Sequence, residues 1–364
     1  MVGHKFVQYN LSVKSSNFDY QISTDKSSLF SQVNRAIVIC DINVKKATYE
    51  LFPETADFIT LTINENEKTL DGVSNLLVKL AQLDVVRGDT LIAVGGGALQ
   101  DLVTLASSIY MRGLKWIFVP TTLMAMLDSC IGGKSSINLG QYKNLVGNFY
   151  PPKSVYIDLV FLKTLNNVDI ACGLAEGVKI CFAASRTDSL VFQDLIRKWR
   201  IQNDFEALKV AIFLSLEKKK WFIEIDEFDK KERKLLNFGH SFGHALEAAT
   251  DFQVPHGIAV FIGMRSALNF VQAPEITNDL LNWIDEEVQL VKQNIGQIQV
   301  SRANFLSALR KDKKNSSTKL CLILPEASGI LSEKYLDLSD EVLESCFNTL
   351  ISALDELELA YEIL

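Results

Sequence analysis

Short apolar runs alternate with amphipathic segments through the first 160 residues, and this alternation constrains the fold more than any other feature. Residues 35–41 (RAIVICD), 88–97 (GDTLIAVGGG) and 116–122 (WIFVPTT) combine branched and aromatic side chains in the way that buried strands do. Residues 74–83 (SNLLVKLAQL) instead space their apolar side chains along one face of a helix. Strands that alternate with helices predict a mainly parallel sheet.

Beyond about residue 165 the pattern changes, because helical runs dominate and strand-like runs become rare. Residues 173–185 (GLAEGVKICFAAS) and 204–222 (DFEALKVAIFLSLEKKKWF) have helical periodicity, whereas residues 319–325 (KLCLILP) form one late strand-like run. No low-complexity linker separates the two parts. The sequence therefore predicts an α/β domain over residues 1–160 and a mainly α-helical domain over residues 161–364.

Composition excludes several classes of protein. Of the 364 residues, 48% are hydrophobic and 22% are charged, which is typical of a globular chain with a large core. The net charge of -7 and the lack of a basic stripe with interleaved aromatic residues argue against nucleic-acid binding. No apolar run is long enough to span a membrane, the N-terminus has no signal-peptide core, and the six cysteines form no CxxC pair. We therefore expect a reduced, cytoplasmic protein without nucleic-acid or membrane partners.

A glycine turn follows the expected strand at residues 93–102 (AVGGGALQDL). Backbone N–H groups in such a turn can approach a phosphate at the positive end of the next helix. The spacing is not GxGxxG, so the residues alone leave phosphate binding and a tight packing turn equally open. Asp101 can be a helix cap or a cofactor contact. Residues 119–123 (VPTTL) end another expected strand with two hydroxyl groups, where open α/β sheets bind ligands.

A second glycine-rich block groups Asp128, Lys134, Lys143 and Asn144. Lysines beside exposed backbone amides can form a phosphate cradle. A glycine-rich surface loop explains the same composition slightly better. The block therefore stays ambiguous as long as only residue types are considered.

Three of the four histidines lie within residues 240–256. His240 and His244 are four residues apart and share one helix face, which is one known metal-binding spacing. Another arrangement pairs one of them with His256 and leaves the other for a substrate. Glu176, in a helical segment, can add a carboxylate, and a carboxylate ligand favours a hard or borderline metal. A lone histidine is more often structural, but this concentration favours a site.

These blocks, in this order, resemble the 3-dehydroquinate synthase family within the wider sugar-phosphate cyclases. The resemblance runs from about Asp41 to about Gly329. It is carried by the ordered segments GGGALQD, YMRG, VPTTL, DSCIGGKSSIN, KNLVGNFYPP, GLAEGVK, RKLLNFGHSFGH, PHG and DKKNSSTKLCLILP. It implies a Rossmann-like NAD-binding domain followed by a helical metal-binding domain, and a homodimer that acts on a small sugar phosphate.

The resemblance also implies roles for individual residues. The metal ligands, usually of zinc and alternatively of cobalt, are implied to be Glu176, His240 and His256. The catalytic residues are implied to be Asp128, Lys179, Lys219, Asn237 and His244. Substrate binding is implied for Arg112, which reaches across the dimer, and for Lys134, Asn144, Arg233 and one of Lys313 and Lys314. NAD contacts are implied for Asn43, Glu65, Lys68, Gly96, Gly97, Asp101, Thr121, Thr122 and Lys143.

The implied reaction accounts for these residue types. NAD⁺ takes hydride from one alcohol of 3-deoxy-D-arabino-heptulosonate 7-phosphate, and a metal lowers the pKa of that alcohol. The new ketone acidifies the adjacent C–H bond, so phosphate leaves by elimination. NADH then returns the hydride, and an intramolecular aldol step closes the ring of 3-dehydroquinate. The substrate phosphate and carboxylate need cationic partners, which explains the lysines and arginines in an acidic protein.

Several positions depart from the family pattern. Asp229 replaces a usual glutamate, Gln100 replaces a small residue, and Ile258 removes an expected carboxylate beside His256. The alternatives are a related cyclase acting on sedoheptulose 7-phosphate or glucose 6-phosphate, and a metal-dependent alcohol or glycerol dehydrogenase. Glu176 argues against a dehydrogenase, because those proteins usually carry aspartate there. A homologue that binds NAD without turnover is a further alternative.

Overall fold

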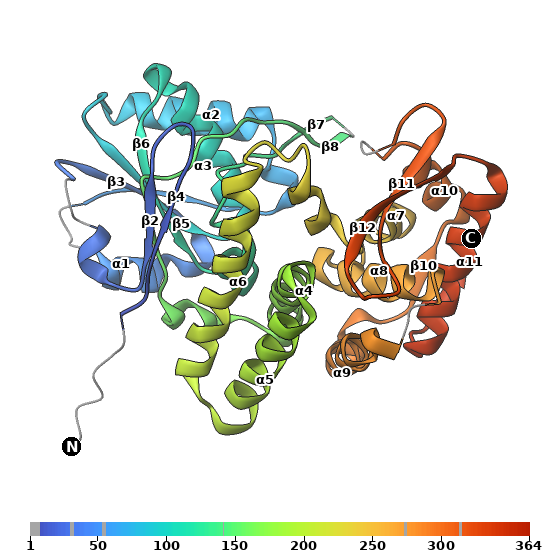
Figure 1. Ribbon diagram of the computed structural model, residues 1–364. Helices are drawn as coiled ribbons and strands as arrows, with labels where there is room; N and C mark the ends of the chain where they lie inside the picture. Colours follow the sequence, from blue (N-terminus) through green and yellow to red (C-terminus); the bar gives the residue numbers. More distant parts are fainter. Residues whose placement is uncertain (1–7, 30–32, 53–55, 141, 273–274, 313–314) are drawn as a thin grey trace. The chain divides into compact units, whose positions relative to one another are not determined.

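The computed structural model describes residues 8–364 apart from 30–32, 53–55, 141, 273–274 and 313–314 (Figure 1). The chain forms two compact units. Unit 1 contains the described residues up to Leu165 together with Lys219–Phe228. Unit 2 contains Asn166–Lys218 and Asp229–Leu364.

Unit 1 is built on a sheet of strands β1 (Asn10–Val13), β2 (Tyr20–Ser23), β3 (Ala36–Asp41), β4 (Asp57–Leu61), β5 (Thr90–Gly95), β6 (Lys115–Pro120) and β9 (Ser154–Tyr156). The spatial order is β1-β2-β9-β6-β5-β3-β4, and only the pair β1 and β2 is antiparallel. Strands β3, β5 and β6 are almost wholly buried, which explains their continuous apolar sequences. The predicted mainly parallel sheet is confirmed.

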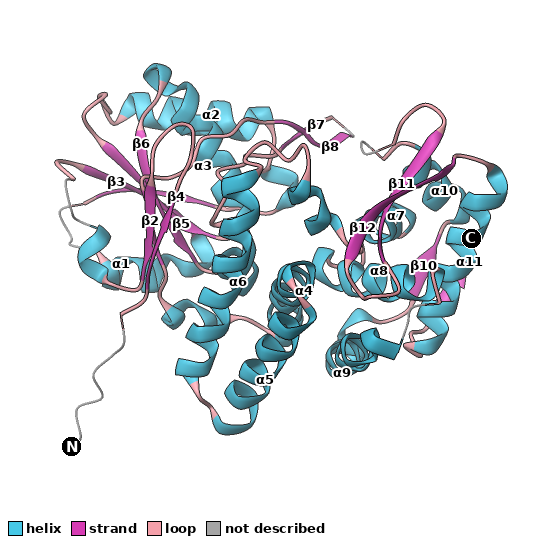
Figure 2. Cartoon of the chain, in the orientation of Figure 1, coloured by secondary structure: helices cyan, strands magenta, loops and turns pink. Residues whose placement is uncertain are grey.

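The larger helices of unit 1 are α1 (Lys45–Leu51), α2 (Leu70–Gln82) and α3 (Gly97–Ile109) (Figure 2). Helix α2 begins where the Thr69 hydroxyl accepts a hydrogen bond of 3.1 Å from the Gly72 backbone N–H. Its buried residues Val73, Leu76 and Leu80 recur at helical spacing. A small antiparallel hairpin is formed by β7 (Ile137–Leu139) and β8 (Tyr142–Val146).

Helix α6 (Phe205–Ile225) is shared between the units, because its last residues group with unit 1. Glu224 accepts a hydrogen bond of 3.0 Å from the Lys14 backbone N–H, and Phe228 packs edge-on against Phe149 at 5.2 Å between ring centroids. The sequence analysis assigned the whole segment to the second domain. Helical periodicity runs through it without a break, so the switch depends on contacts with distant residues that periodicity does not reveal.

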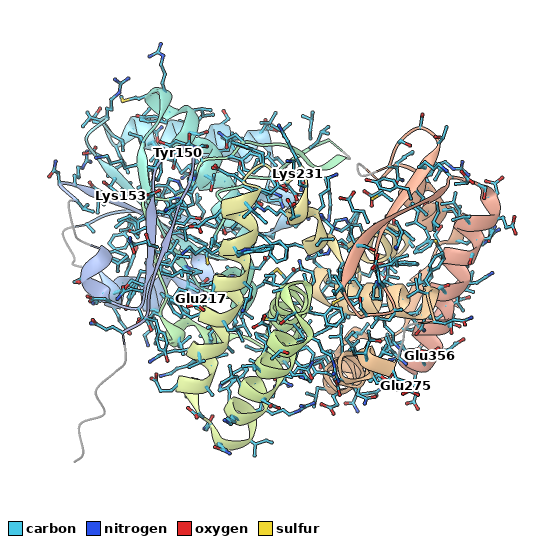
Figure 3. All side chains as sticks on the ribbon, viewed as in Figure 1. Tyr150, Lys153, Glu217, Lys231, Glu275 and Glu356 are labelled. Carbon is cyan, nitrogen blue, oxygen red and sulfur yellow. The ribbon has the colours of Figure 1, made fainter. Side chains whose placement is uncertain are left out.

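Unit 2 is mainly helical (Figure 2) and contains α4 (Asn167–Ala184), α5 (Arg186–Gln202), α7 (His240–Ala249), α8 (His256–Phe270), α9 (Asn278–Ile295), α10 (Arg302–Arg310) and α11 (Asp340–Glu356). Glu356 at the end of α11, labelled in Figure 3, accepts hydrogen bonds from Arg265 of α8 at 3.1 Å from Nε and 2.8 Å from Nη2. The predicted helical second part is thus confirmed. Among the described residues, no helix is both long and apolar enough to cross a bilayer.

Strands also occur in unit 2. The predicted strand-like run is β11 (Lys319–Pro325), and it pairs with the antiparallel strand β12 (Leu331–Asp337). A second pair is parallel and joins β10 (Ile298–Val300) to β13 (Tyr361–Ile363). The sequence analysis did not predict these three partner strands. They are short or only partly buried, so they lack the continuous apolar run that marks a buried strand.

Glycines bring α4, α7 and α8 into close contact. A methyl group on Gly263 of α8 would lie 2.1 Å from the Gly239 carbonyl oxygen, immediately before α7. A methyl group on Gly257, also in α8, would lie 2.2 Å from the Cys172 Cα atom in α4. Neither position can accept a side chain unless backbone moves. These two contacts fix the spacing of the helices that carry the candidate metal ligands.

Candidate active site

The histidines of unit 2 converge where α7 and α8 pack against each other and against α4. His240 is the first residue of α7, His244 follows one turn later, and His256 is the first residue of α8. The ring centroids are 5.1 Å apart for His240 and His244, and 5.4 Å apart for His240 and His256. One nitrogen from each of the three rings lies within 4.8 Å of the others. We call these three residues the histidine cluster.

Glu176 of α4 faces the histidine cluster with one carboxylate oxygen. Its Oε1 atom lies 3.2 Å from His256 Nε2 and 3.6 Å from His240 Nε2, and the side chain is 2% exposed. Its Oε2 atom accepts a hydrogen bond from Lys179, one turn along the same helix. Within the described chain Oε1 is buried and has no hydrogen bond of acceptable geometry. A buried acceptor without a donor, beside two imidazoles, fits a divalent cation.

The donor set therefore suits Zn²⁺ or Co²⁺, for which nitrogen and carboxylate ligands are ordinary. Two ligand sets remain compatible with the geometry. One consists of Glu176, His240 and His256, as the resemblance implies. The other is the histidine cluster itself. The distances place all four groups together without deciding between the two sets, so the implied ligand set stays a prediction.

Charge around His256 favours its protonated form when the site holds no cation. Burial lowers the pKa of His256, but contacts with Glu176 and Glu247 outweigh it and raise the pKa to about 10. Burial likewise raises the pKa of Glu176, whereas Lys179 and His256 lower it more, so the net pKa of Glu176 is below its usual value. A metal ion binds a carboxylate in its anionic form, and it displaces the proton of an imidazole that becomes its ligand. Glu176 and His256 are in the charge states from which such binding begins.

Glu247 is a functional candidate that the sequence analysis missed. Its Oε2 atom lies 3.3 Å from His256 Nδ1, on the side of the ring away from Glu176. The expectation that Ile258 leaves His256 without a carboxylate is therefore wrong, because Glu247 supplies one from α7. Ile258 is fully buried in the core. Glu247 follows His240 by seven residues, and this two-turn spacing was the available signal.

Two further predicted residues of unit 2 precede the histidine cluster. Arg233 and Asn237 lie in the 3-10 helix η7 (Glu232–Asn237), and Arg233 is buried at 3% exposure. Asn237 Nδ2 donates a 3.0 Å hydrogen bond to the Lys234 carbonyl. Lys234 in turn pairs with Glu333 of β12 at 3.4 Å, which ties η7 to the strand pair. Lys313 and Lys314 lie outside the described residues.

In unit 1 the structure brings four predicted residues together around one ammonium group. Lys68 Nζ lies 2.9 Å from Asn144 Oδ1, 3.0 Å from Glu65 Oε1 and 3.3 Å from Asp101 Oδ2. We call these residues the Lys68 network. Burial raises the pKa of Asp101 to about 7, although Lys68 opposes the shift. Asn138, which the sequence analysis assigned no role, donates to Glu65 Oε1 at 3.1 Å.

The glycine turn lies where the parallel strands end. Gly96 and Gly97 follow β5, Thr121 and Thr122 follow β6, and Asn43 follows β3. A methyl group on Gly96 would lie 3.0 Å from Thr122 Cγ2, so the two strand ends approach closely. No described side chain caps the N-terminus of α3, which leaves its first backbone N–H groups to a ligand. This edge of the sheet can bind a phosphate.

Asp128 and Lys219 form a close pair in unit 1. Lys219 Nζ lies 2.6 Å from Asp128 Oδ1 and donates a 2.7 Å hydrogen bond to the Asp128 carbonyl. Asp128 belongs to the π-helix η5 (Ala125–Ser129). Lys134 Nζ lies over the Phe149 ring at 5.9 Å from the centroid. Lys143 is part of β8.

Arg112 is exposed and ends the 3-10 helix η4 (Tyr110–Arg112). Its φ of 67° and the Met111 φ of 48° place two non-glycine residues in the left-handed region. Such backbone persists only where neighbours hold it. Here Arg87 donates a 3.0 Å hydrogen bond to the Met111 carbonyl, and Tyr150, labelled in Figure 3, donates one of 2.9 Å to the Leu114 carbonyl.

Comparison with known proteins gives consistent matches. Family models described as 3-dehydroquinate synthase N-terminal and C-terminal match residues 58–172 and 173–315. The 3-dehydroquinate synthase of Saccharolobus solfataricus is 34% identical over 84% of this chain and 88% of its own length. The 3-dehydroquinate synthase of Helicobacter pylori strain HPAG1 is 36% identical over 73% of this chain and 76% of its own length.

Solved structures show the same fold at lower identity. A 2-deoxy-scyllo-inosose synthase complexed with carbaglucose-6-phosphate, NAD⁺ and Co²⁺ matches with a TM-score of 0.77 and 22% identity, over 93% of this chain and 98% of that one. The 2-epi-5-epi-valiolone synthase from Streptomyces hygroscopicus subsp. jinggangensis, with NAD⁺ and Zn²⁺ bound, matches with a TM-score of 0.77 and 22% identity. The match covers 95% of this chain and 99% of that one. A probable glycerol dehydrogenase from Sinorhizobium meliloti matches with a lower TM-score of 0.54 and 11% identity. The match covers 91% of this chain and 93% of that one.

Proposed function

Because this chain belongs to the 3-dehydroquinate synthase family, we propose that it converts 3-deoxy-D-arabino-heptulosonate 7-phosphate to 3-dehydroquinate and phosphate. The reaction makes it an NAD- and metal-dependent lyase that eliminates phosphate and closes a ring. The observation that carries the proposal is the buried Glu176 Oε1 atom, which faces His240 and His256 without a hydrogen bond among the described residues.

Glu176, His240 and His256 would hold the metal. When bound, the cation supplies Lewis-acid stabilisation of the reacting oxygen, and NAD⁺ accepts and returns the hydride. Lys179 holds Glu176 by its Oε2 atom, so that Oε1 points at the imidazoles. Glu247 holds the Nδ1 side of His256 and leaves Nε2 toward Glu176.

His244 is proposed to exchange protons with the substrate. Its ring is 5.1 Å from that of His240 and 5.7 Å from that of His256, so the three imidazoles form one polar surface. A neutral imidazole can accept a proton near neutral pH, as the enolisation and aldol steps require. Asn237 and Arg233 are proposed to bind the sugar acid, because an arginine can meet a carboxylate with two parallel hydrogen bonds.

The cofactor contacts are proposed for unit 1, and the phosphate contacts for residues of both parts of the chain. The uncapped start of α3 and the glycine turn suit the NAD pyrophosphate. Glu65, Lys68 and Asp101 supply side-chain hydrogen-bonding groups for the rest of the cofactor, as do Asn43, Thr121, Thr122 and Lys143. Asn144 is proposed to bind the substrate. Lys134 and one lysine of Lys313 and Lys314 are proposed to bind the substrate phosphate. A domain division near residue 160 separates cofactor binding from metal binding.

The direct test is incubation of the purified protein with the seven-carbon sugar acid phosphate, NAD⁺ and Zn²⁺. We expect phosphate release and 3-dehydroquinate by mass spectrometry, with no net change in absorbance at 340 nm because NADH is reoxidised. Equal concentrations of sedoheptulose 7-phosphate are added as competitor. Preferential turnover of that sugar would favour the related cyclase, and accumulation of NADH would favour a dehydrogenase.

A homodimer with shared active sites is also part of the proposal, with Arg112 serving the phosphate site of the partner. Arg112→Ala and Lys134→Ala should each be inactive, and a mixed dimer of the two should contain one intact site. Recovered activity after subunit exchange supports sharing. No recovery in dimers shown to be mixed contradicts it. We propose a cytoplasmic location, which agrees with the burial of all six cysteines.

A further inference from the structure

Gln100 connects the glycine turn of unit 1 to the π-helix that carries Asp128. Its side chain is 2% exposed and lies in the first turn of α3. Gln100 Nε2 donates a 2.7 Å hydrogen bond to the Ser129 carbonyl, and the Ser129 hydroxyl donates a 2.7 Å hydrogen bond to Gln100 Oε1. The Gln100 side chain makes both bonds, so it cannot turn away without breaking both, whereas the Ser129 side chain makes only the second.

Ser129 is the neighbour of Asp128, and each residue is bound through both its backbone and its side chain. Asp128 meets Lys219 through its carbonyl at 2.7 Å and its carboxylate at 2.6 Å. Ser129 meets Gln100 through its carbonyl and its hydroxyl in the same manner. Two consecutive residues at the end of η5 therefore link Lys219 on α6 to Gln100 on α3.

The segment held in this way is a π-helix. Short π-helical turns are rare and occur frequently at functional sites. In η5 the Cys130 N–H donates to the Ala125 carbonyl at 3.0 Å, and the Met126 N–H donates to the Thr122 carbonyl at 3.0 Å. The Ser129 hydroxyl also lies beside the glycine turn, 3.7 Å from where a Gly97 methyl group would be.

We propose that Gln100 is a positioning residue that fixes Asp128, and through it Lys219, relative to the glycine turn. The inference rests on the proposed function for the roles of Lys219 and the turn. A smaller side chain at residue 100 could not span the gap to Ser129, so this chain has a rigid link at the position where its relatives' pattern has a small residue. Gln100 touches no reacting atom in this scheme and acts only through Asp128.

The first test needs no activity. Gln100→Leu keeps the volume but removes both hydrogen bonds, and hydrogen exchange is followed by mass spectrometry over residues 122–131. We expect the Met126 and Cys130 amides to exchange about tenfold faster than in the wild type. The matched control is Gln193→Leu, which breaks a buried glutamine–serine hydrogen bond of 3.2 Å in α5 of unit 2. The control should leave this segment unchanged.

Unchanged protection of the segment in Gln100→Leu would overturn the proposal. Should that variant fail to fold, Ser129→Ala removes only the hydroxyl bond, and an increase of about threefold is expected in the same amides. Unchanged exchange in Ser129→Ala would overturn the proposal equally.

The second test asks whether Gln100 acts through Lys219. Gln100→Leu should lower kcat/KM for the sugar phosphate about tenfold in the wild-type background, because the Asp128–Lys219 pair is loosened. In a Lys219→Arg background, where the pair is already altered, the same change should cost less than about twofold. Equal losses in both backgrounds would indicate general destabilisation and overturn the proposal. Absence of product from the wild type would instead refute the proposed function, and hydrogen exchange would still decide the role of Gln100.

Discussion

The histidine cluster of unit 2 and the Lys68 network of unit 1 use different kinds of backbone. The histidine cluster stands on helices whose spacing is fixed by glycine contacts, and its carboxylate partner Glu176 is almost wholly buried. The Lys68 network instead joins a 3-10 turn, the start of α3 and a hairpin strand. The first arrangement orients its groups before any ligand arrives, whereas the second has more freedom to adapt when a ligand binds.

The largest expected effect is the loss of a ligand from the rigid region. His256→Ala should lose the bound metal and lower turnover by about a thousandfold or more, because a three-ligand site rarely survives with two. Metal content is measured by elemental analysis of the dialysed protein, alongside product formation. Full occupancy in the variant would show that the ligand assignment is wrong and would favour a set that excludes His256.

The metal affinity of the histidine cluster should depend steeply on pH. His256 has a pKa raised to about 10 without a cation, so a metal must displace its proton below that pH. Displacement of one proton changes the affinity about tenfold for each pH unit. Zinc affinity should therefore rise about a hundredfold from pH 6 to pH 8. Calorimetric titration at several pH values measures this slope. A flat profile would contradict the charge state inferred for His256.

The same pKa predicts how the metal-free protein responds to base. The folded-state pKa of His256 lies above its unfolded value of about 6.5, so the stabilisation is complete below pH 6.5 and is lost as the pH rises toward 10. The melting temperature of metal-free protein should fall across that window. Zinc-loaded protein should lose less stability there, because its His256 carries no proton. If the melting temperatures of the metal-free and the zinc-loaded protein fell in parallel with pH, the prediction would be wrong.

The adaptable region is tested by Lys68→Met. Loss of the ammonium leaves Glu65 and Asp101 without their shared cation, and the KM for NAD⁺ should rise about thirtyfold. The zinc affinity should stay unchanged, since the metal ligands belong to unit 2. Lys79→Met, on α2 away from the network, is the matched control. A change in zinc affinity in Lys68→Met would show that the Lys68 network and the histidine cluster do not act independently.

The smallest expected effect concerns Glu247. Glu247→Gln removes the charge beside His256 Nδ1 but keeps a hydrogen-bonding group, so zinc affinity should fall about tenfold. Glu286→Gln, at an exposed position of α9, serves as the control. With Co²⁺ in place of Zn²⁺, the visible spectrum should shift in Glu247→Gln alone. An unaltered affinity and spectrum would mean that Glu247 does not orient His256.

The sequence predicted those parts of the fold that a repeating pattern records. Strand β5 is a continuous apolar run, and the i, i+4 spacing of His240 and His244 matches one face of α7. Glu176 could be offered from the sequence as a carboxylate, but only the family resemblance assigned it to the same ligand set, because nothing in the spacing joins α4 to α7 across more than sixty residues. Physical proximity there depends on Gly257 and Gly263, whose importance appears only when the helices are packed.

The contacts that were missed are those between elements remote in sequence. Gln100 was noted as an unusual residue, but its partner Ser129 follows by 29 residues and no periodicity links the two. Glu247 was overlooked because the expected carboxylate was sought at Ile258, two residues after His256. The end of α6 was assigned to the wrong side of the predicted division, since a helix pattern does not record which neighbours its last turns meet.

The glycine contacts of α8 also determine which size of metal ion the site can hold. His240 and His256 each begin a helix, so the distance between their ring nitrogens follows the separation of α7 and α8. Gly263→Ala would push a methyl group against the Gly239 carbonyl oxygen and force the helices apart. Ligands held farther apart suit a larger cation than zinc. The choice among divalent ions would then depend on the absence of a side chain at Gly263, a residue that does not contact the ion.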